Sequence, residues 1–120
     1  MLSLKTKIST PHVKACAAFY EDLLGLHRVE TWDDPNDAGI ILALGSSPHS
    51  ALIELSQQET VSDLSGLSLQ IKVDDLCAFL DTVPDGLPYE GPTARPWGAR
   101  YAYFTDPAGF SVIIFDGPTH

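Results

Sequence analysis

The sequence predicts an α+β fold in which a unit of one strand, one helix and three strands occurs twice. Residues 100–115 form a predicted β-hairpin around Asp106-Pro107-Ala108-Gly109, a turn whose residue types each favour tight reversal of the chain. Residues 40–55 form a second predicted hairpin, and superposing its Pro48 on Pro107 aligns the two hairpins without a gap. The sequence therefore predicts two copies of one structural unit.

The first half gives the order of elements in that unit. Residues 2–8 alternate between apolar and polar side chains, which is typical of a strand. Thr10-Pro11 is expected to cap and begin a helix over residues 11–24, and Gly25 is expected to end it. The remaining predicted elements of this half are a strand at 27–32, an acidic loop at 33–39 and hairpin strands at 40–44 and 51–56.

The second half repeats this order after a polar link at residues 57–66. Residues 67–73 alternate again, and Asp74 or Asp75 is expected to cap a helix that ends near Val83. A short strand at 87–91, a loop at 92–96 and the hairpin at 100–115 complete the predicted order. We expect a single domain over residues 1–120, with units at 1–57 and 67–118 that form a curved mixed sheet around a cleft.

Composition limits the classes of function. The chain has 120 residues and a net charge of −9, which argues against nucleic acid as a partner because phosphate binding needs clustered Lys and Arg. The charge is compatible with a cationic small-molecule ligand, although solubility alone also explains it. We expect no membrane span and no signal peptide. Cys16 and Cys77 are expected to be free, buried thiols, which favours a cytoplasmic location.

Strand alternation predicts which side chains line the cleft. Strand faces with only apolar side chains should meet the helix, and faces of mixed polarity should line the cleft. This rule places the following residues on the cleft face: Lys5, Lys7, Leu52, Glu54, Ser56, Ser68, Gln70, Ser111, Ile113 and Phe115.

Three motifs of this duplicated unit resemble one family. They are FYEDLLGL in the first helix, ALIEL in the fourth strand and WG…DPAGFSVIIF at the end of the chain. Together they resemble the glyoxalase/bleomycin resistance/extradiol dioxygenase superfamily, also called the vicinal oxygen chelate superfamily. PWGARYAYFTDPAGF looks most like the bleomycin-resistance branch. The resemblance covers nearly the whole chain and implies the glyoxalase/bleomycin resistance fold and a homodimer.

The resemblance also implies positions for a metal, which this sequence does not fill. Enzymes of the family hold a divalent metal with His, Gln or Glu from the first and fourth strands of each unit. Those positions correspond to Lys5, Glu54, Ser68 and Ile113, of which only Glu54 is a credible ligand. One carboxylate cannot build a catalytic Zn or Fe site, so we predict no metal and no cofactor. The four histidines, which we do not expect on the cleft face of a ligand strand, are His12, His27, His49 and His120.

Three hypotheses for function follow. In the first, the protein sequesters an aromatic or cationic antibiotic-like ligand without metal, as the resistance branch implies, and Glu54 pairs with a ligand cation or accepts a hydrogen bond. In the second, it is a metal-free lyase or isomerase-type enzyme with Glu54 as general base, although a Lys5–Glu54 ion pair would instead fill the metal position. In the third, Glu54 binds a metal with His49 or His27. The aromatic residues expected to contact the ligand, each of which also fits an ordinary core role, are Trp32, Trp97, Tyr101, Tyr103 and Phe115.

Overall fold

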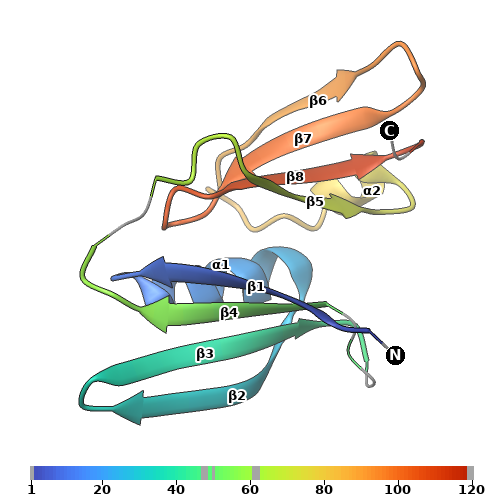
Figure 1. The fold of residues 1–120 in the computed structure, drawn as a ribbon. Helices are drawn as coiled ribbons and strands as arrows, with labels where there is room; N and C mark the ends of the chain where they lie inside the picture. The colour runs from blue at the N-terminus through green and yellow to red at the C-terminus, as the bar shows by residue number, and fades with distance from the viewer. Residues whose placement is uncertain (1, 47–48, 50, 61–62, 119–120) are drawn as a thin grey trace. The chain divides into compact units, whose positions relative to one another are not determined.

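The chain forms two compact units, Met1–Asp63 and Leu64–His120, each with the predicted order of elements (Figure 1). The computed structural model describes residues 2–46, 49, 51–60 and 63–118. Ser47 and Pro48 of the predicted first turn, and His120, lie outside the described residues. The first unit contains β1 (Leu4–Thr10), α1 (Val13–Leu24), β2 (His27–Asp34), β3 (Asp37–Leu44) and β4 (Ala51–Gln57). The second unit contains β5 (Ser68–Lys72), α2 (Leu76–Leu80), β6 (Glu90–Ala94), β7 (Arg100–Thr105) and β8 (Ser111–Asp116).

Each unit builds one mixed four-stranded sheet. The strand orders are β1-β4-β3-β2 and β5-β8-β7-β6, and in both sheets the first strand of the unit runs parallel to the fourth. The registers correspond as well, because Lys5 lies opposite Leu52 and Ser68 lies opposite Ser111. Glu54 and Ile113 therefore occupy matching positions two residues further along. This correspondence confirms the α+β fold of two tandem βαβββ units.

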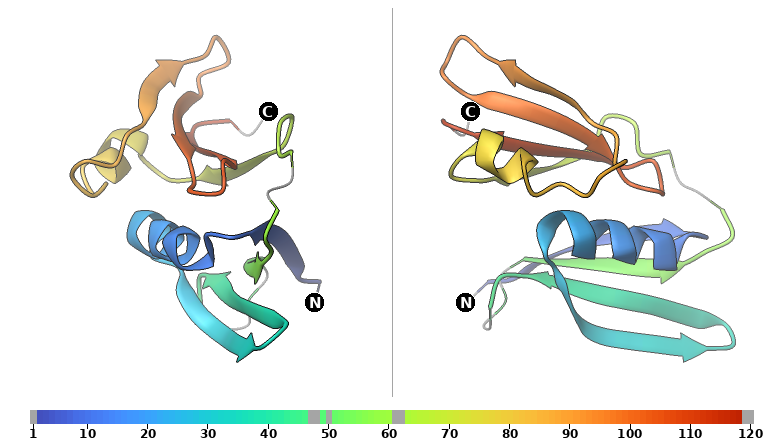
Figure 2. Two further views of the ribbon diagram at one scale, coloured as in Figure 1. Left: turned by 90° about the vertical axis from the view of Figure 1, so that its left-hand side faces the viewer. Right: turned by 180° about the vertical axis from the view of Figure 1, so that it is seen from behind.

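One face of each sheet packs on the helix of the same unit (Figure 2). In the first unit, Leu42 and Leu55 are fully buried on the face that meets α1, where Tyr20 is also fully buried. In the second unit, Leu76 of α2 and Ile114 of β8 are fully buried in the same way. Burial of these side chains follows the predicted rule that purely apolar faces meet the helix. We call the opposite side of each sheet its helix-free face.

Several boundaries in the first unit differ from the prediction, and β1 spans Leu4–Thr10 instead of the predicted 2–8. The helix begins at Val13 rather than at Pro11, because the hydroxyl of Thr10 accepts a hydrogen bond from His12 N at 3.0 Å and β1 continues to Thr10. Gly25 ends α1 as predicted, with φ of 67° and its N–H donating to Glu21 O. The acidic segment at 33–39 is largely strand and not loop, since β2 and β3 pair up to Asp34 opposite Asp37.

Two boundaries in the second unit also differ. Asp75 caps α2 as one of the two predicted residues, accepting a hydrogen bond from Ala78 N at 3.2 Å. The helix ends at Leu80 and not near Val83, because Thr82 N and its hydroxyl both donate to Phe79 O and tighten the last turn. β6 occupies Glu90–Ala94, so the strand lies later than the predicted 87–91 and takes in part of the predicted loop. Its register shifts between Glu90 and Thr93, which marks a bulge.

The two cysteines are free thiols that lie in the two helices. Cys16 is buried in α1, as predicted. Cys77 is exposed, so the expectation of burial was wrong for this residue. The reason is the shortness of α2, in which Leu76 is the buried residue. Among the described residues, no helix has the length and apolar character needed to cross a membrane.

Candidate functional site

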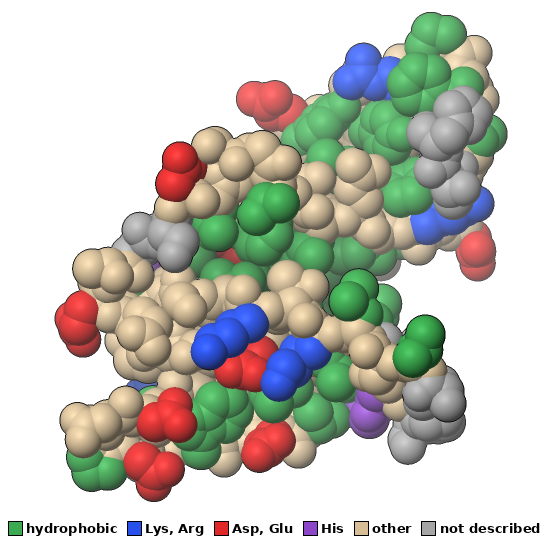
Figure 3. Space-filling view, in the orientation of Figure 1, with side chains coloured by type: hydrophobic (Ala, Val, Ile, Leu, Met, Phe, Trp, Pro, Cys, Tyr) green, Lys and Arg blue, Asp and Glu red, His purple; other side chains and the backbone are tan. Residues whose placement is uncertain are grey.

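The helix-free face of the first sheet carries an ion pair at the position where the family resemblance implies metal ligands. Lys5 Nζ lies 2.7 Å from Glu54 Oε1. The Glu54 side chain is 12% exposed and that of Lys5 is 46% exposed. Figure 3 shows basic side chains next to an acidic one over β1 and β4. The predicted Lys5–Glu54 pair is therefore confirmed.

The residues at the four implied ligand positions do not fit a metal. A charged Lys5 has no lone pair, Ile113 has no donor atom, and the one carboxylate already contacts the ammonium group. His27 Nε2 and His49 Nε2 lie 3.2 Å apart and contact each other. Among the described residues, however, no group of three His, Cys, Asp or Glu side chains is arranged to hold a metal ion.

Trp32 lies on the same helix-free face as Glu54. It stands opposite Gly39 in the β2–β3 ladder, and its indole Nε1 donates to Asp37 Oδ1 at 2.9 Å. The indole therefore has a fixed orientation and leaves part of its ring exposed. A shallow pocket of about 400 Å³ lies beside it. The residues that line this pocket are Lys5, Glu30, Trp32, Asp34, Asp37, Ile41 and Glu54.

The helix-free face of the second sheet carries a group of aromatic side chains. Tyr101 lies opposite Phe115, and their ring centroids are 5.5 Å apart. The Tyr101 ring also lies 6.4 Å from the rings of Trp97 and Tyr103. Phe115 is buried and supports Tyr101 from the sheet, whereas Trp97 is 40% exposed. Hydrophobic side chains gather over the strands of this unit in Figure 3. The structure thus brings four of the five predicted aromatic residues together.

Arg95 also belongs to this aromatic group, although no pattern in the sequence predicted a role for it. Its Nη2 donates to the Tyr103 hydroxyl at 2.7 Å, and its guanidinium carbon lies 5.8 Å from the centroid of the Tyr101 ring. The backbone of Arg95 is fixed by the turn between β6 and β7, where Arg95 N donates to Ala99 O and Gly98 N donates to Arg95 O. The only signal in the sequence was the proximity of this arginine to Trp97 in a loop flanked by prolines.

A small pocket opens among these side chains. Its volume is about 260 Å³. Ligand pockets usually have volumes of about 300–1,000 Å³, so this one suits a small aromatic group and not a whole drug-sized molecule. The residues that line it are Gln70, Arg95, Trp97, Tyr101, Tyr103 and Ile113. Gln70 and Ile113 were both predicted to lie on this face.

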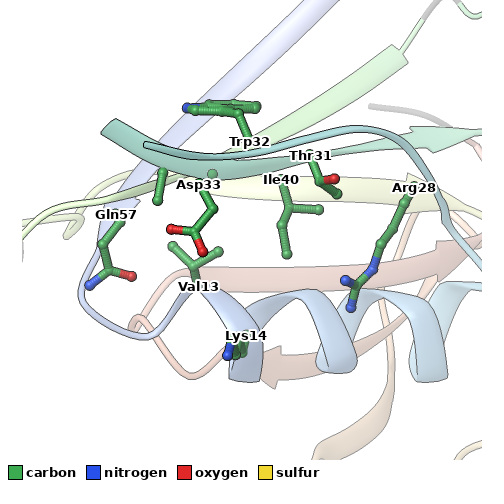
Figure 4. Close-up of a pocket in the computed structure, with 10 residues that line it drawn as sticks. Val13, Lys14, Arg28, Thr31, Trp32, Asp33, Ile40 and Gln57 are labelled. Carbon is green, nitrogen blue, oxygen red and sulfur yellow. The ribbon is translucent and has the colours of Figure 1, made fainter. Parts of the chain in front are cut away.

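A larger pocket of the first unit, about 530 Å³, lies on the opposite side of its sheet (Figure 4). Val13 and Lys14 of α1 border it, and Trp32 projects from the other side of β2. The guanidinium of Arg28 at its edge is held by Glu21, with Nε donating to Oε2 at 3.0 Å. A second polar side chain of this pocket, Gln57, donates its amide Nε2 to Pro11 O at 3.2 Å.

An ion pair between the buried Asp116 and the partly exposed Arg100 anchors α2 to the second sheet. Asp116 is 5% exposed, and it accepts hydrogen bonds from Leu76 N at 2.8 Å and from Arg100 Nε at 3.1 Å. The hydrogen bonds from Arg100 lower the pKa of the Asp116 carboxyl, and burial opposes this effect. The same contacts raise the pKa of the Arg100 guanidinium. Arg100 Nη1 also lies 3.1 Å from Cys77 Sγ. We interpret this cluster as structural, since it fastens the start of the helix to β8.

Comparison with known proteins agrees with this architecture. The family model described as the glyoxalase/bleomycin resistance protein/dioxygenase superfamily matches residues 4–114. The chain therefore belongs to this superfamily. Among curated proteins, no sequence matches the chain.

Solved structures of low sequence identity share the fold. TnmS3, an antibiotic binding protein from Streptomyces sp. CB03234, is 18% identical with a TM-score of 0.78, over 98% of this chain and 97% of that one. The fosfomycin resistance protein FosX from Listeria monocytogenes is 10% identical with a TM-score of 0.79, over 98% and 94%. FosX from Mesorhizobium loti is 16% identical with a TM-score of 0.74, over 96% and 90%. At these identities the likeness concerns the fold alone.

Proposed function

We propose that this protein binds an aromatic small molecule, of the kind found among antibiotics, without a metal and without turnover. One observation carries the proposal: Trp97, Tyr101 and Tyr103 surround a pocket on a sheet face that does not pack on the helix of its own unit. Each stacked pair of aromatic rings contributes about 0.5–1.5 kcal/mol of binding free energy in addition to the contribution from buried apolar area.

The fold is compatible with this proposal. Within the superfamily fold, TnmS3 is described as an antibiotic binding protein, and the FosX proteins as fosfomycin resistance proteins. The Lys5–Glu54 ion pair supports binding over catalysis, because a general base needs its carboxylate directed at a substrate proton and not at a lysine. We therefore do not favour the lyase or isomerase-type hypothesis for Glu54.

We further propose that the protein works as a homodimer in the cytoplasm. The pockets beside Trp32 and Tyr101 are each shallow and belong to single units, so a drug-sized ligand needs a second surface to cover it. Closed twofold symmetry would provide two equivalent sites. The acidic lining beside Trp32 would accept a ligand cation there, with Glu30 and Asp34 available in addition to the paired Glu54. Sedimentation equilibrium of the full chain tests the dimer.

A titration tests the binding function. The full chain is titrated with a panel of planar polycyclic aromatic antibiotics while tryptophan fluorescence is followed, and each ligand is then recovered and analysed by chromatography. We expect saturable quenching and complete recovery of at least one intact ligand. Tyr101→Ala should lower the affinity for that ligand about tenfold, since it removes the central stacking ring. Tyr89→Ala is the control, because Tyr89 is a tyrosine of the same unit that packs on Phe104 and does not line this pocket.

Three results would contradict the proposal. Consumption of the ligand would identify an enzyme. Equal weakening by Tyr101→Ala and Tyr89→Ala would place the ligand elsewhere. Stoichiometric transition metal in the purified protein, with binding lost after chelation, would show that the site depends on a metal.

A further inference from the structure

We propose that the aromatic ligand of the second unit carries an acidic group, such as a carboxylate, which Arg95 binds. This inference rests on the proposed function and specifies the chemical class of its ligand. It differs from the expectation of a cationic ligand, which came from the net charge of −9 and from Glu54. The contacts of Arg95 carry the inference.

Arg95 has more hydrogen-bond donors than its contacts within the described chain use. A guanidinium group has five N–H donors in a planar fork. One donor of Arg95 bonds the Tyr103 hydroxyl at 2.7 Å. Within the described part of the chain, no carboxylate forms an ion pair with this side chain, in contrast to Arg28 and Arg100. Arg95 therefore keeps donors for a ligand, and its positive charge has no carboxylate partner among the described residues.

The guanidinium group of Arg95 is held in one orientation by its neighbours. The Tyr101 ring lies 5.8 Å from the guanidinium carbon, and the tyrosine hydroxyl holds one edge of the fork. The turn that closes through Arg95 N and Ala99 O at 2.8 Å fixes the backbone beneath it. A planar cation held in this way is preorganised to bind a carboxylate through two parallel hydrogen bonds.

The other residues that line the pocket are aromatic or neutral. Tyr101 and Trp97 provide ring faces beside the guanidinium, and the Gln70 amide adds a neutral donor and acceptor. Among the residues that line this pocket, none is acidic.

Arg95 would thus repel a cationic ligand, and no acidic side chain lining the pocket would offset this repulsion. A one- or two-ring aromatic acid would instead contact a ring surface and a charge of opposite sign. At physiological ionic strength charges more than about 8 Å away are screened, so the charged groups nearest the ligand have the largest effect. Arg95 is the charged residue that lines this pocket, whereas Glu90, which lies opposite Tyr103 in the β6–β7 ladder, lines a neighbouring pocket.

Three matched probes test this inference by isothermal titration calorimetry on the full chain: 2-naphthoate, 2-naphthamide and 2-naphthylmethylammonium. We expect 2-naphthoate to bind most tightly. Arg95→Gln should weaken 2-naphthoate about tenfold or more, because charge-assisted hydrogen bonds are lost while glutamine keeps a donor for Tyr103. The same variant should change 2-naphthamide binding less than about threefold. Arg95→Lys should retain part of the preference, since lysine keeps the charge but not the planar fork.

Arg28→Gln is the control, because Arg28 is an arginine of the first unit that is paired with Glu21 and lies outside this pocket. It should leave the binding of all three probes unchanged. If the amide or the ammonium probe binds as tightly as 2-naphthoate or more tightly, the inference is wrong. If the binding of that probe is also weakened by Tyr101→Ala, the proposed function still holds. Equal weakening of all probes by Arg95→Gln would also overturn the inference. If none of the probes binds, the acid preference is wrong, and the antibiotic panel separately decides the proposed function.

Discussion

Lys5 Nζ lies 2.7 Å from Glu54 Oε1, although the residue directly opposite Glu54 across the parallel ladder is Lys7. The pair is therefore diagonal, and both residues project from the helix-free face. In the resemblance to the superfamily, these two positions would supply metal ligands. Here an ammonium group compensates the carboxylate, so the first sheet needs no metal to satisfy this charge.

A double-mutant cycle measures the energy of this pair. Lys5→Met and Glu54→Gln, alone and combined, should give a coupling free energy of about 0.5–1 kcal/mol in urea unfolding, because Lys5 is half exposed to water. The coupling should decrease in about 1 M salt, where the Debye length is about 3 Å. Lys7→Met with Glu54→Gln is the control cycle. Coupling in the control cycle equal to that of Lys5 would show that the observed diagonal pairing is not the preferred one in solution.

Asp116 gives a prediction with a defined pH dependence. The pKa of its carboxyl is lowered in the folded protein from an ordinary value of 3.8, first by the hydrogen bond from Arg100. A carboxyl whose pKa is lowered by folding stabilises the protein fully above its unfolded pKa, and this stabilisation is lost as the pH falls through the folded pKa. Asp116→Asn should therefore lower the free energy of unfolding by about 1–3 kcal/mol near neutral pH, and the difference should narrow below pH 3.8.

Urea unfolding of the wild type and the Asp116→Asn variant at several pH values checks this prediction. Asp85→Asn is a suitable control, since Asp85 is an exposed carboxylate beyond the end of α2. A constant difference between wild type and Asp116→Asn down to the acid limit would contradict the linkage. It would mean that the packing of the side chain at position 116, and not its negative charge, accounts for the stabilisation.

Features set by local turn chemistry could be predicted from the sequence. Gly25 ends α1 in the left-handed conformation, and Asp106 bonds the backbone two residues on, both as expected from residue type. The alternation of the strands also placed Glu54 on the correct face. These features depend on residues close together in the chain, so the sequence carries the information directly.

Features set by pairing with a distant strand could not be predicted in the same way. The position of β6 depends on which of its residues pair with β7, and the bulge between Glu90 and Thr93 moves the strand along the chain. The position of Arg95 depends on the β6–β7 turn, which follows this strand. No periodic pattern marks a residue whose contacts arise from a turn, which is why the aromatic part of the site was predicted and its arginine was not.

Gly39 illustrates another contact that composition does not reveal. A Cβ atom at this position would overlap the Trp32 ring and would lie 2.6 Å from Leu55 O. Gly39→Ala should therefore destabilise the first unit by about 1–3 kcal/mol and change the tryptophan fluorescence, since the indole must move. Adding Trp32→Ala should restore only part of the stability, because the backbone carbonyl of Leu55 cannot move away. Full recovery in the double variant would show that the ring is the sole obstacle.

Asp106 supports the hairpin that carries Tyr101, Tyr103 and Phe115. Its Oδ1 accepts hydrogen bonds from Ala108 N and Phe110 N, both at 2.9 Å, and the side chain is buried. Asp106→Ala should lower the free energy of unfolding by about 1–3 kcal/mol, because two backbone N–H groups lose their acceptor. Asp106→Asn retains an acceptor oxygen and should cost less. Chemical unfolding of both variants provides the measurement, and equal losses would show that the hairpin depends on the charge of Asp106 and not on its two hydrogen bonds.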